Sequence, residues 1–199
     1  MKRLVLPALL VILFSTDASA IPFTISGPAQ IDVDTNPGTE IDLISALDGT
    51  ITDLNVSVNI TGGHMEDFNL FLTSPDGTTV QFRTNFVDPV VFHIDAPLLA
   101  TFDDEAAALH SAQTSGGTGT FQPFAPLTAF DGLNLLGTWT LTVTDAFAPD
   151  EGNDLVAWSI SGTYEPDATA PVPEPASLTL LGLGLAGMAG RRWRQRKRG

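Results

Sequence analysis

The sequence contains no cysteine in its 199 residues. Disulfide bonds, thiolate metal sites and cysteine nucleophiles are therefore excluded. The folded protein has to be stabilised by an apolar core, with or without a bound metal ion. Without its two end segments, described below, the chain is long enough for one domain with a sizeable core.

Basic residues are scarce between the two ends. Lys2 and Arg3 open the chain and six more Lys or Arg residues lie in 191–198, so residues 21–173, here called the body, keep only Arg83 against 21 acidic residues. The net charge of the body is therefore near −20. Such a surface repels nucleic acid and anionic lipid and attracts cations. Solubility outside the cell is the simpler explanation for most of these carboxylates.

Helical periodicity is nearly absent, and only Asp103–His110 looks helical, for a turn or two. Apolar residues instead alternate with polar ones, which is typical of strands with one buried face. The alternating residues are Leu54, Val56, Val58 and Ile60; Phe68, Leu70 and Leu72; Val80 and Phe82; Trp139, Leu141 and Val143; and Val156, Trp158, Ile160 and Tyr164. Ser74-Pro75-Asp76-Gly77 predicts a hairpin turn, and residues 111–120 predict a mobile loop. Many short strands predict an all-β antiparallel sandwich or barrel.

Residues 1–20 have the layout of a secretory signal peptide. Two basic residues precede an apolar run from Leu4 to Phe14, and Ala18-Ser19-Ala20 follows. Small residues at Ala18 and Ala20 are those that a signal peptidase reads, so we expect cleavage after Ala20 and export of the protein.

The C-terminal end combines a proline motif, an apolar run and a basic tail. Val172-Pro173-Glu174-Pro175 precedes 15 uncharged residues, 176–190, and an Arg-rich end. The basic end favours an orientation with the tail in the cytoplasm. Because a membrane-spanning helix usually needs about 20 residues, this short transmembrane helix is marginal and suits a temporary anchor.

This order of features resembles a PEP-CTERM sorting signal over roughly residues 172–198. The resemblance implies a Gram-negative bacterium that makes extracellular polysaccharide, and an exosortase that cuts near the motif formed by Val172, Pro173, Glu174 and Pro175. The protein would then be held briefly in the inner membrane and delivered to the cell envelope or the extracellular space. These residues are expected to be a processing site and not a catalytic one.

Three ordered motifs carry a second resemblance. They are His64-Met65-Glu66-Asp67-Phe68-Asn69-Leu70-Phe71-Leu72-Thr73-Ser74-Pro75-Asp76-Gly77-Thr78, Thr101-Phe102-Asp103-Asp104-Glu105-Ala106, and Gly137–Asp145 followed by Gly152 and Leu155–Ile160. Together they resemble the P domain of proprotein convertases, also called P/Homo B, over roughly residues 40–164. The resemblance implies a jelly-roll β-sandwich. We expect a signal peptide at 1–20, this domain at 21–164, a linker at 165–171 and the sorting signal at 172–199.

The resemblance also implies a calcium site, because some bacterial members bind calcium at acidic loops. The matching positions here are Asp67, Asp103, Asp104 and Asp145. Calcium takes six to eight oxygen ligands from adjoining loops, and all four positions are expected in loops that converge at one end of the sandwich. The alternative is that Asp67 and Asp145 cap turns and that Asp103 caps a helical turn.

Catalytic motifs are absent. The three histidines, His64, His93 and His110, form no H-E-x-x-H pattern, and the sequence has no G-x-S-x-G elbow or Gly-rich phosphate loop. His64 is interpreted as a strand-entry residue beside Asp67, and Trp139 and Trp158 as core residues. The sequence therefore predicts a protein that is not an enzyme.

In the proprotein convertases the P domain follows a subtilisin-like catalytic domain, and here we expect none before the first matched strand. The interpretation is a structural or adhesive protein of the extracellular matrix. Two alternatives stay open, a carbohydrate-binding module for extracellular polysaccharide and an accessory chain to a separate subtilisin-like protease or another envelope protein.

Overall fold

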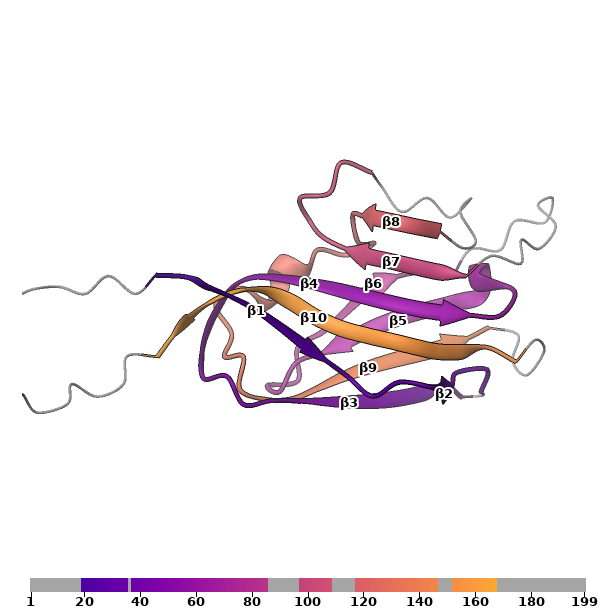
Figure 1. The fold of residues 1–199 in the computed structure, drawn as a ribbon, viewed down its shortest axis with the longest axis horizontal. Helices are drawn as coiled ribbons and strands as arrows, with labels where there is room; N and C mark the ends of the chain where they lie inside the picture. Colours follow the sequence, from indigo (N-terminus) through magenta and orange to yellow (C-terminus); the bar gives the residue numbers. More distant parts are fainter. Residues whose placement is uncertain (1–18, 36, 86–96, 109–116, 147–151, 168–199) are drawn as a thin grey trace, which may run out of the picture. The chain divides into compact units, whose positions relative to one another are not determined.

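Strands make up most of the described part of the chain (Figure 1). The computed structural model describes residues 19–35, 37–85, 97–108, 117–146 and 152–167. The elements in chain order are β1 (Ile21–Ser26), β2 (Ile31–Asp32), β3 (Thr39–Ser45), β4 (Gly49–Thr61), the 3-10 helix η1 (Met65–Asp67), β5 (Phe68–Thr73), β6 (Thr79–Arg83), β7 (Leu98–Phe102), β8 (Gly117–Phe121), the 3-10 helix η2 (Leu127–Phe130), β9 (Gly137–Asp145) and β10 (Asp154–Pro166).

The strands form two sheets that pack face to face, so the predicted all-β sandwich is confirmed. One sheet has the order β1-β10-β4-β7-β8, with β2 paired to β10, and the other has the order β3-β9-β5-β6. The chain passes repeatedly between the sheets, and Figure 1 shows β4 and β10 in front of β5 and β9. Every strand pair is antiparallel except β7 and β8, which run parallel.

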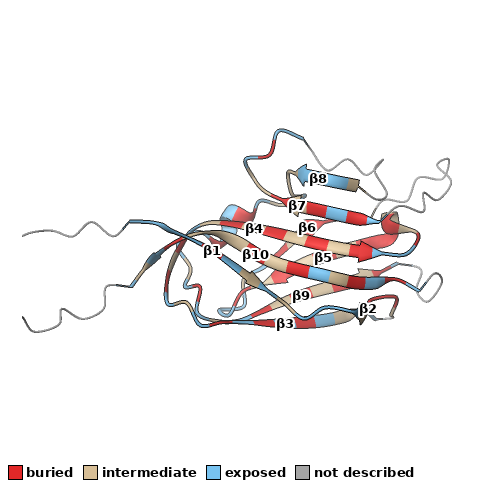
Figure 2. Cartoon of the chain, viewed as in Figure 1, coloured by how far each residue is buried: buried red, intermediate tan, exposed pale blue. Residues whose placement is uncertain are grey.

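The alternation in the sequence matches the alternation of burial along the strands, as Figure 2 shows for β4, β7 and β10. Every second residue of β4 from Leu54 to Ile60 is buried, as are Phe68, Leu70 and Leu72 in β5. Trp139 and Trp158 are both in the core, as expected. The hairpin turn between β5 and β6 is present, and Gly77 has a positive φ of 91° that favours glycine there.

Strand β10 departs from the expected parity at its start. Val156 is only partly buried, and Leu155 occupies the core in its place. The cause is an irregularity in the pairing with β4 between Leu155 and Ala157, which shifts the side chains by one position before Trp158. A bulge of this kind leaves no clear signal in the sequence.

Two further expectations are wrong. Within Asp103–His110, the described residues 103–108 form a turn and no helix, closed by a hydrogen bond of 3.1 Å from the Ala106 N–H to the Asp103 carbonyl. Within the expected loop 111–120, residues 117–120 belong to strand β8. Their polar composition is typical of a loop, but they form a strand because they pair with β7 along its length. Residues 109–116 lie outside the described part.

The core is anchored by aromatic pairs. Phe130 of η2 packs edge-on against Trp139 with ring centroids 5.3 Å apart, and the Trp139 Nε1 donates a hydrogen bond of 3.0 Å to the Leu135 carbonyl. Phe82 and Phe102 join the two sheets in the same way at 5.0 Å. The buried side chains of Leu127 and Phe130 fix η2 against the core. The neighbouring residues of η2 are therefore held in place at the surface of the sandwich.

Arg83 is the one Lys or Arg among the described residues, and it is buried. Its Nη1 donates a hydrogen bond to the Phe68 carbonyl and its Nη2 donates one to the Met65 carbonyl, so it ties the end of β6 to η1. Burial lowers the pKa of Arg83 to about 10, while Glu66 and Asp67 act in the opposite direction. The side chain therefore stays charged at neutral pH.

The chain divides into two compact units, residues 1–166 and 167–199. Ala18 and the motif Val172–Pro175 lie outside the described residues, so their roles stay predictions. Strand β1 begins at Ile21, and cleavage after Ala20 would therefore leave every described strand intact. Within the described ranges, no helix has the length and apolar character needed to span a membrane.

Candidate functional site

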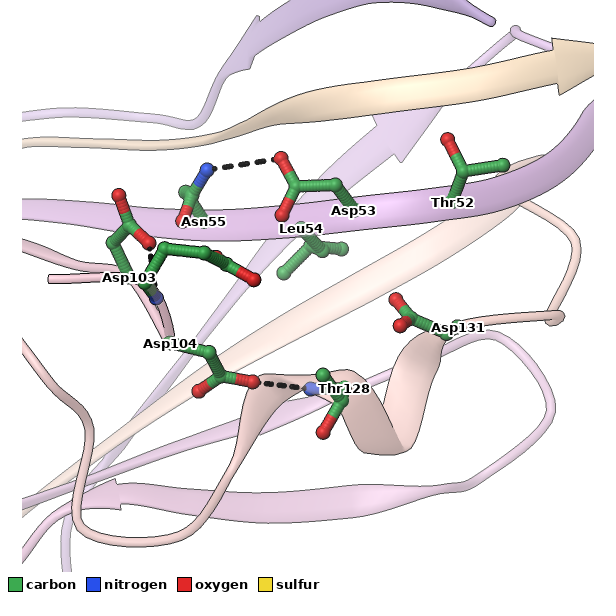
Figure 3. A pocket seen from close by; sticks show the side chains of 9 residues that line it. Thr52, Asp53, Leu54, Asn55, Asp103, Asp104, Thr128 and Asp131 are labelled. Atoms are coloured by element: carbon green, nitrogen blue, oxygen red, sulfur yellow. Dashed lines mark hydrogen bonds between the residues drawn. The ribbon is translucent and has the colours of Figure 1, made fainter.

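Five carboxylate side chains line one hollow of about 350 Å³ at the edge of the sandwich (Figure 3). We call this the acidic hollow. Its carboxylates come from β4, from the turn after β7 and from the end of η2, together with the neutral side chains of Thr52, Leu54, Asn55 and Thr128. The carboxylates belong to Asp53, Asp103, Asp104, Glu105 and Asp131.

Pairing of β4 with β7 brings the first two groups together. Val56 of β4 lies opposite Phe102 of β7, so the residues after Phe102 lie beside the first half of β4. Asp103 is fixed there because its N–H donates a hydrogen bond of 2.9 Å to the Phe121 carbonyl, and its Oδ1 accepts one of 2.8 Å from the Glu105 N–H. This last bond is the turn-capping role that the sequence left open for Asp103.

Asp104 ties the turn after β7 to η2. Its Oδ1 accepts a hydrogen bond of 3.0 Å from the Leu127 N–H, and its Oδ2 accepts one of 2.7 Å from the Thr128 N–H, which Figure 3 shows. The far end of η2 then places Asp131 at the same hollow. Two segments far apart in sequence are therefore joined by one carboxylate.

The crowded carboxylates disfavour ionisation of one another. Partial burial raises the pKa of Asp53 above its ordinary value of 3.8, and the charges of Asp103 and Asp104 raise it further, against the hydrogen bond from Asn55. Asp131 also has a raised pKa, through burial and then through Asp53 and Asp104. The pKa of Glu105 is raised first by its hydrogen bond with Asp103. No Lys or Arg lines the hollow among the described residues.

The other two predicted metal ligands lie elsewhere. Asp67 ends η1 and Asp145 ends β9, and the register places Phe68 opposite Asp145, with the Ala146 N–H donating a hydrogen bond of 3.2 Å to the Asp67 carbonyl. Both carboxylate residues are buried. The negative charge of Asp67 raises the pKa of Arg83 and so helps to keep the buried guanidinium protonated. This carboxylate therefore has a structural role.

The expectation that all four aspartates converge at one end of the sandwich is wrong. Asp67 follows the C-terminal end of β4, whereas Asp103 and Asp104 lie beside its first half because β7 runs antiparallel to β4. The structure therefore gives two pairs. Sequence spacing did not reveal this, because it carries no information on strand register.

The donor set of the acidic hollow matches the chemistry of calcium, since every ligating atom that it offers is oxygen. The Oδ1 atom of Asn55 is buried and has no hydrogen-bond partner among the described residues, which leaves one further oxygen for a cation. However, in the described part of the chain no three or more His, Cys, Asp or Glu side chains are arranged to hold a metal ion. The oxygen chemistry fits calcium, but the side chains do not form a finished site.

Asp53 and Asp131 were not predicted. Asp53 interrupts a run of neutral residues on the outer parity of β4, and Asp131-Gly132 is a turn signal. Each pattern is common, and only the pairing of β4 with β7 and the packing of η2 bring the two side chains to one hollow.

Two family models match the chain. Residues 51–161, more than half of it, match the proprotein convertase P-domain, and residues 171–197 match the PEP-CTERM protein-sorting motif. No curated protein matches the chain.

Two solved structures are similar over most of the chain. One is the serine protease of Aeromonas sobria in complex with the chaperone ORF2, at 17% identity and a TM-score of 0.49, covering 75% of this chain and 28% of the other. The second is the serine protease of Aeromonas sobria, at 17% identity and a TM-score of 0.46, covering 76% and 28%. The chain thus spans 28% of the length of these protease structures.

Because the pKa of Asp53 is raised, removing this carboxylate is predicted to stabilise the fold by an amount that depends on pH. A carboxyl group whose folded pKa lies above its unfolded value stabilises the fold fully below the unfolded pKa, and this contribution is lost as pH rises through the folded pKa. Asp53→Asn is therefore expected to raise the melting temperature of the purified chain at pH 7, and the gain should shrink as the pH falls towards 3.8.

Glu40→Gln is the matched control for this experiment, because Glu40 is exposed on β3 and its removal changes the net charge equally. Melting curves of the three proteins across the pH range are the measurement. A gain for Asp53→Asn that equals that of the control, or that does not change with pH, would contradict the mutual repulsion in the hollow.

Proposed function

Because the chain belongs to the proprotein convertase P-domain family and ends in a PEP-CTERM protein-sorting motif, we propose that it is an exported, non-catalytic β-sandwich module of the envelope or extracellular matrix of a Gram-negative bacterium. Its role there is structural or adhesive. The observation that carries this proposal is the presence of both matches, one on the sandwich and one on the tail.

Sorting is the task of the tail. The matched segment contains Val172-Pro173-Glu174-Pro175, the motif near which an exosortase would cut after the apolar residues 176–190 had entered the inner membrane. Anchoring in the membrane would be temporary, because the apolar run is shorter than a stable membrane-spanning helix, which needs about 20 residues. Cleavage would also remove six of the nine basic residues.

The sandwich is the part that would act outside the cell. The order β1-β10-β4-β7 facing β3-β9-β5-β6 supports a jelly roll, because each sheet alternates strands that are distant in sequence. The P domain is a non-catalytic module, and a sandwich stabilised by a buried core suits a surface exposed outside the cell. We propose no reaction for it.

Calcium binding is part of this proposal, and the acidic hollow is its best-supported location. A divalent cation there would relieve the repulsion that raises the pKa values of Asp53 and Asp131, and it would find carboxylate oxygens and the Asn55 Oδ1. Asp103 and Asp104 would take part, while Asp67 and Asp145 would not. Because the ligands are not fully assembled, we expect weak binding.

An accessory role beside a separate subtilisin-like protease is the second candidate. The family match supports it, since P domains of proprotein convertases follow such catalytic domains. Under this alternative the purified chain would bind a subtilisin-like protease from the same cell and protect it against thermal inactivation. The structural role predicts no such effect.

The sorting proposal predicts that Glu174→Ala blocks processing, because it removes the carboxylate between the two prolines of the motif. In cells that contain an exosortase, the variant should stay in the inner-membrane fraction with its Arg-rich tail attached, whereas the unaltered chain should lose the tail. Immunoblots of cell fractions with an antibody against residues 191–199 measure this.

Glu165→Ala serves as the control, since Glu165 is an exposed residue at the end of β10 and its loss changes the charge equally. It should be processed like the unaltered chain. Release of the Glu174→Ala variant without its tail would refute the assignment of the motif.

Calcium is expected to bind with a dissociation constant of about 10⁻⁴–10⁻³ M, the range of extracellular modules. At about ten times this constant it should add about 1.4 kcal/mol to the free energy of unfolding. Isothermal titration and melting curves in chelator-treated buffer measure both effects on the full chain, and Asp53→Asn with Asp131→Asn should abolish them. Equal calcium effects in the unaltered and doubly substituted chains would contradict the location, and no effect in either would contradict calcium binding.

A further inference from the structure

A second hollow lies on the outer face of the β1-β10-β4-β7-β8 sheet, beside the acidic hollow. Ser57 and Thr101 line it, each two residues along the chain from a residue of the acidic hollow, Asn55 and Asp103. Its volume is about 410 Å³, within the range of small-ligand sites. Its lining comes from β10, β4 and β7, with Ser26 of β1 and the residues that follow it. We call it the neutral hollow, because none of the described residues that line it is charged.

Hydroxyl groups are aligned across the strands in and beside this hollow. The pairing registers place in one line, here called the hydroxyl row, Ser26, Ser159, Ser57, Thr101 and Thr120. Neighbouring strands are about 4.8 Å apart, so the row offers a hydroxyl at each such interval. Ser57 and Thr101 hydrogen-bond to each other at 2.8 Å, which fixes the centre of the row.

The next row of cross-strand neighbours leaves the surface of the sheet accessible to a ligand. Ala157, Asn59 and Leu99 lie side by side on β10, β4 and β7, and Ala157 and Leu99 are exposed. Asn59 adds an amide that can both donate and accept hydrogen bonds. Short side chains on β10 therefore leave room above the sheet, beside groups able to bond to a polar ligand.

Trp158 lies beneath the hollow, on the core side of β10. It lines the neutral hollow and is buried, and its Nε1 donor has no hydrogen-bond partner. Gly27, which also lines the hollow, lies directly against the indole, because a Cβ at this position would come within 1.9 Å of Nε1. Because Ala157 and Ser159 point outward and Trp158 points to the core, this donor belongs to the core side of β10, and the outward side chains are the ones that a ligand would meet.

The composition of the hollow selects its ligand class. Nucleic acid, anionic lipid and acidic polymers are repelled by a body with 21 acidic residues and one arginine. A peptide cannot add as a strand here, since β10, β4 and β7 are already paired with neighbours on both sides. Hydroxyl and amide groups without charge suit a ligand that itself carries many uncharged hydroxyls.

We propose that the neutral hollow binds a neutral oligosaccharide through the hydroxyl row and Asn59. This goes beyond the proposed function, which requires no ligand on this face. The hydroxyl row would exchange hydrogen bonds with the sugar hydroxyls, and the short side chain of Ala157 would let the sugar approach the sheet.

The test uses the purified full chain and neutral gluco-, manno- and xylo-hexasaccharides, with alginate and polygalacturonate as acidic comparators. Binding of at least one neutral hexasaccharide is expected by isothermal titration, and no binding of the acidic polymers. Ala157→Gln, which fills the floor of the hollow, should weaken binding by about tenfold or more. Ser159→Ala should also weaken binding, because it removes one hydroxyl of the row without adding bulk.

Ala46→Gln is the matched control, because Ala46 is exposed in the connection between β3 and β4 and does not line the hollow. It should bind as the unaltered chain does, and melting curves should show that all variants are folded. No binding of any neutral hexasaccharide, equal binding by Ala157→Gln, or a preference for the acidic polymers would overturn the proposal. None of these outcomes affects the sorting of the tail, which is measured separately.

Discussion

Burial of the single arginine of the body determines much of this structure. Arg83 closes η1 by donating hydrogen bonds to the Met65 and Phe68 carbonyls, and it balances the charge of Asp67 inside the sandwich. Removing one partner of such a buried group costs several kcal/mol, on the order of 3–5. Because its one Lys or Arg side chain is buried, the described part of the sandwich has no Lys or Arg on its surface.

The surface properties follow from that arrangement. Carboxylates that meet at the acidic hollow have no Lys or Arg beside them in the described part of the chain and raise one another's pKa values, so protons or divalent cations are the partners that stabilise them. The neutral hollow is the exception on this surface, because serine, threonine and asparagine replace acids over three adjoining strands. The outer face of this sheet thus presents an acidic and a neutral hollow side by side along β4, and repulsion by the acids restricts what reaches the neutral one.

The sequence predicted the sandwich well because the signal was local. Alternation along β4, β5 and β9 depends only on neighbouring residues, and it located the core correctly, including Trp139 and Trp158. The candidate site was predicted only in part. Asp103 and Asp104 were found through their motif, but Asp53 and Asp131 reach the hollow through strand register and the packing of η2. The bulge at Leu155–Ala157 and the parallel β8 are likewise products of pairing.

We propose that export and sorting remove both basic ends and leave an acidic sandwich with Arg83 as its sole arginine. Intact-mass and terminal-peptide mass spectrometry of the protein recovered from the envelope and the medium tests this most directly. We expect an N-terminus at Ile21 and a C-terminus near Val172–Pro175, with no peptide from residues 191–199. A mature protein that keeps the Arg-rich tail outside the inner membrane would contradict it.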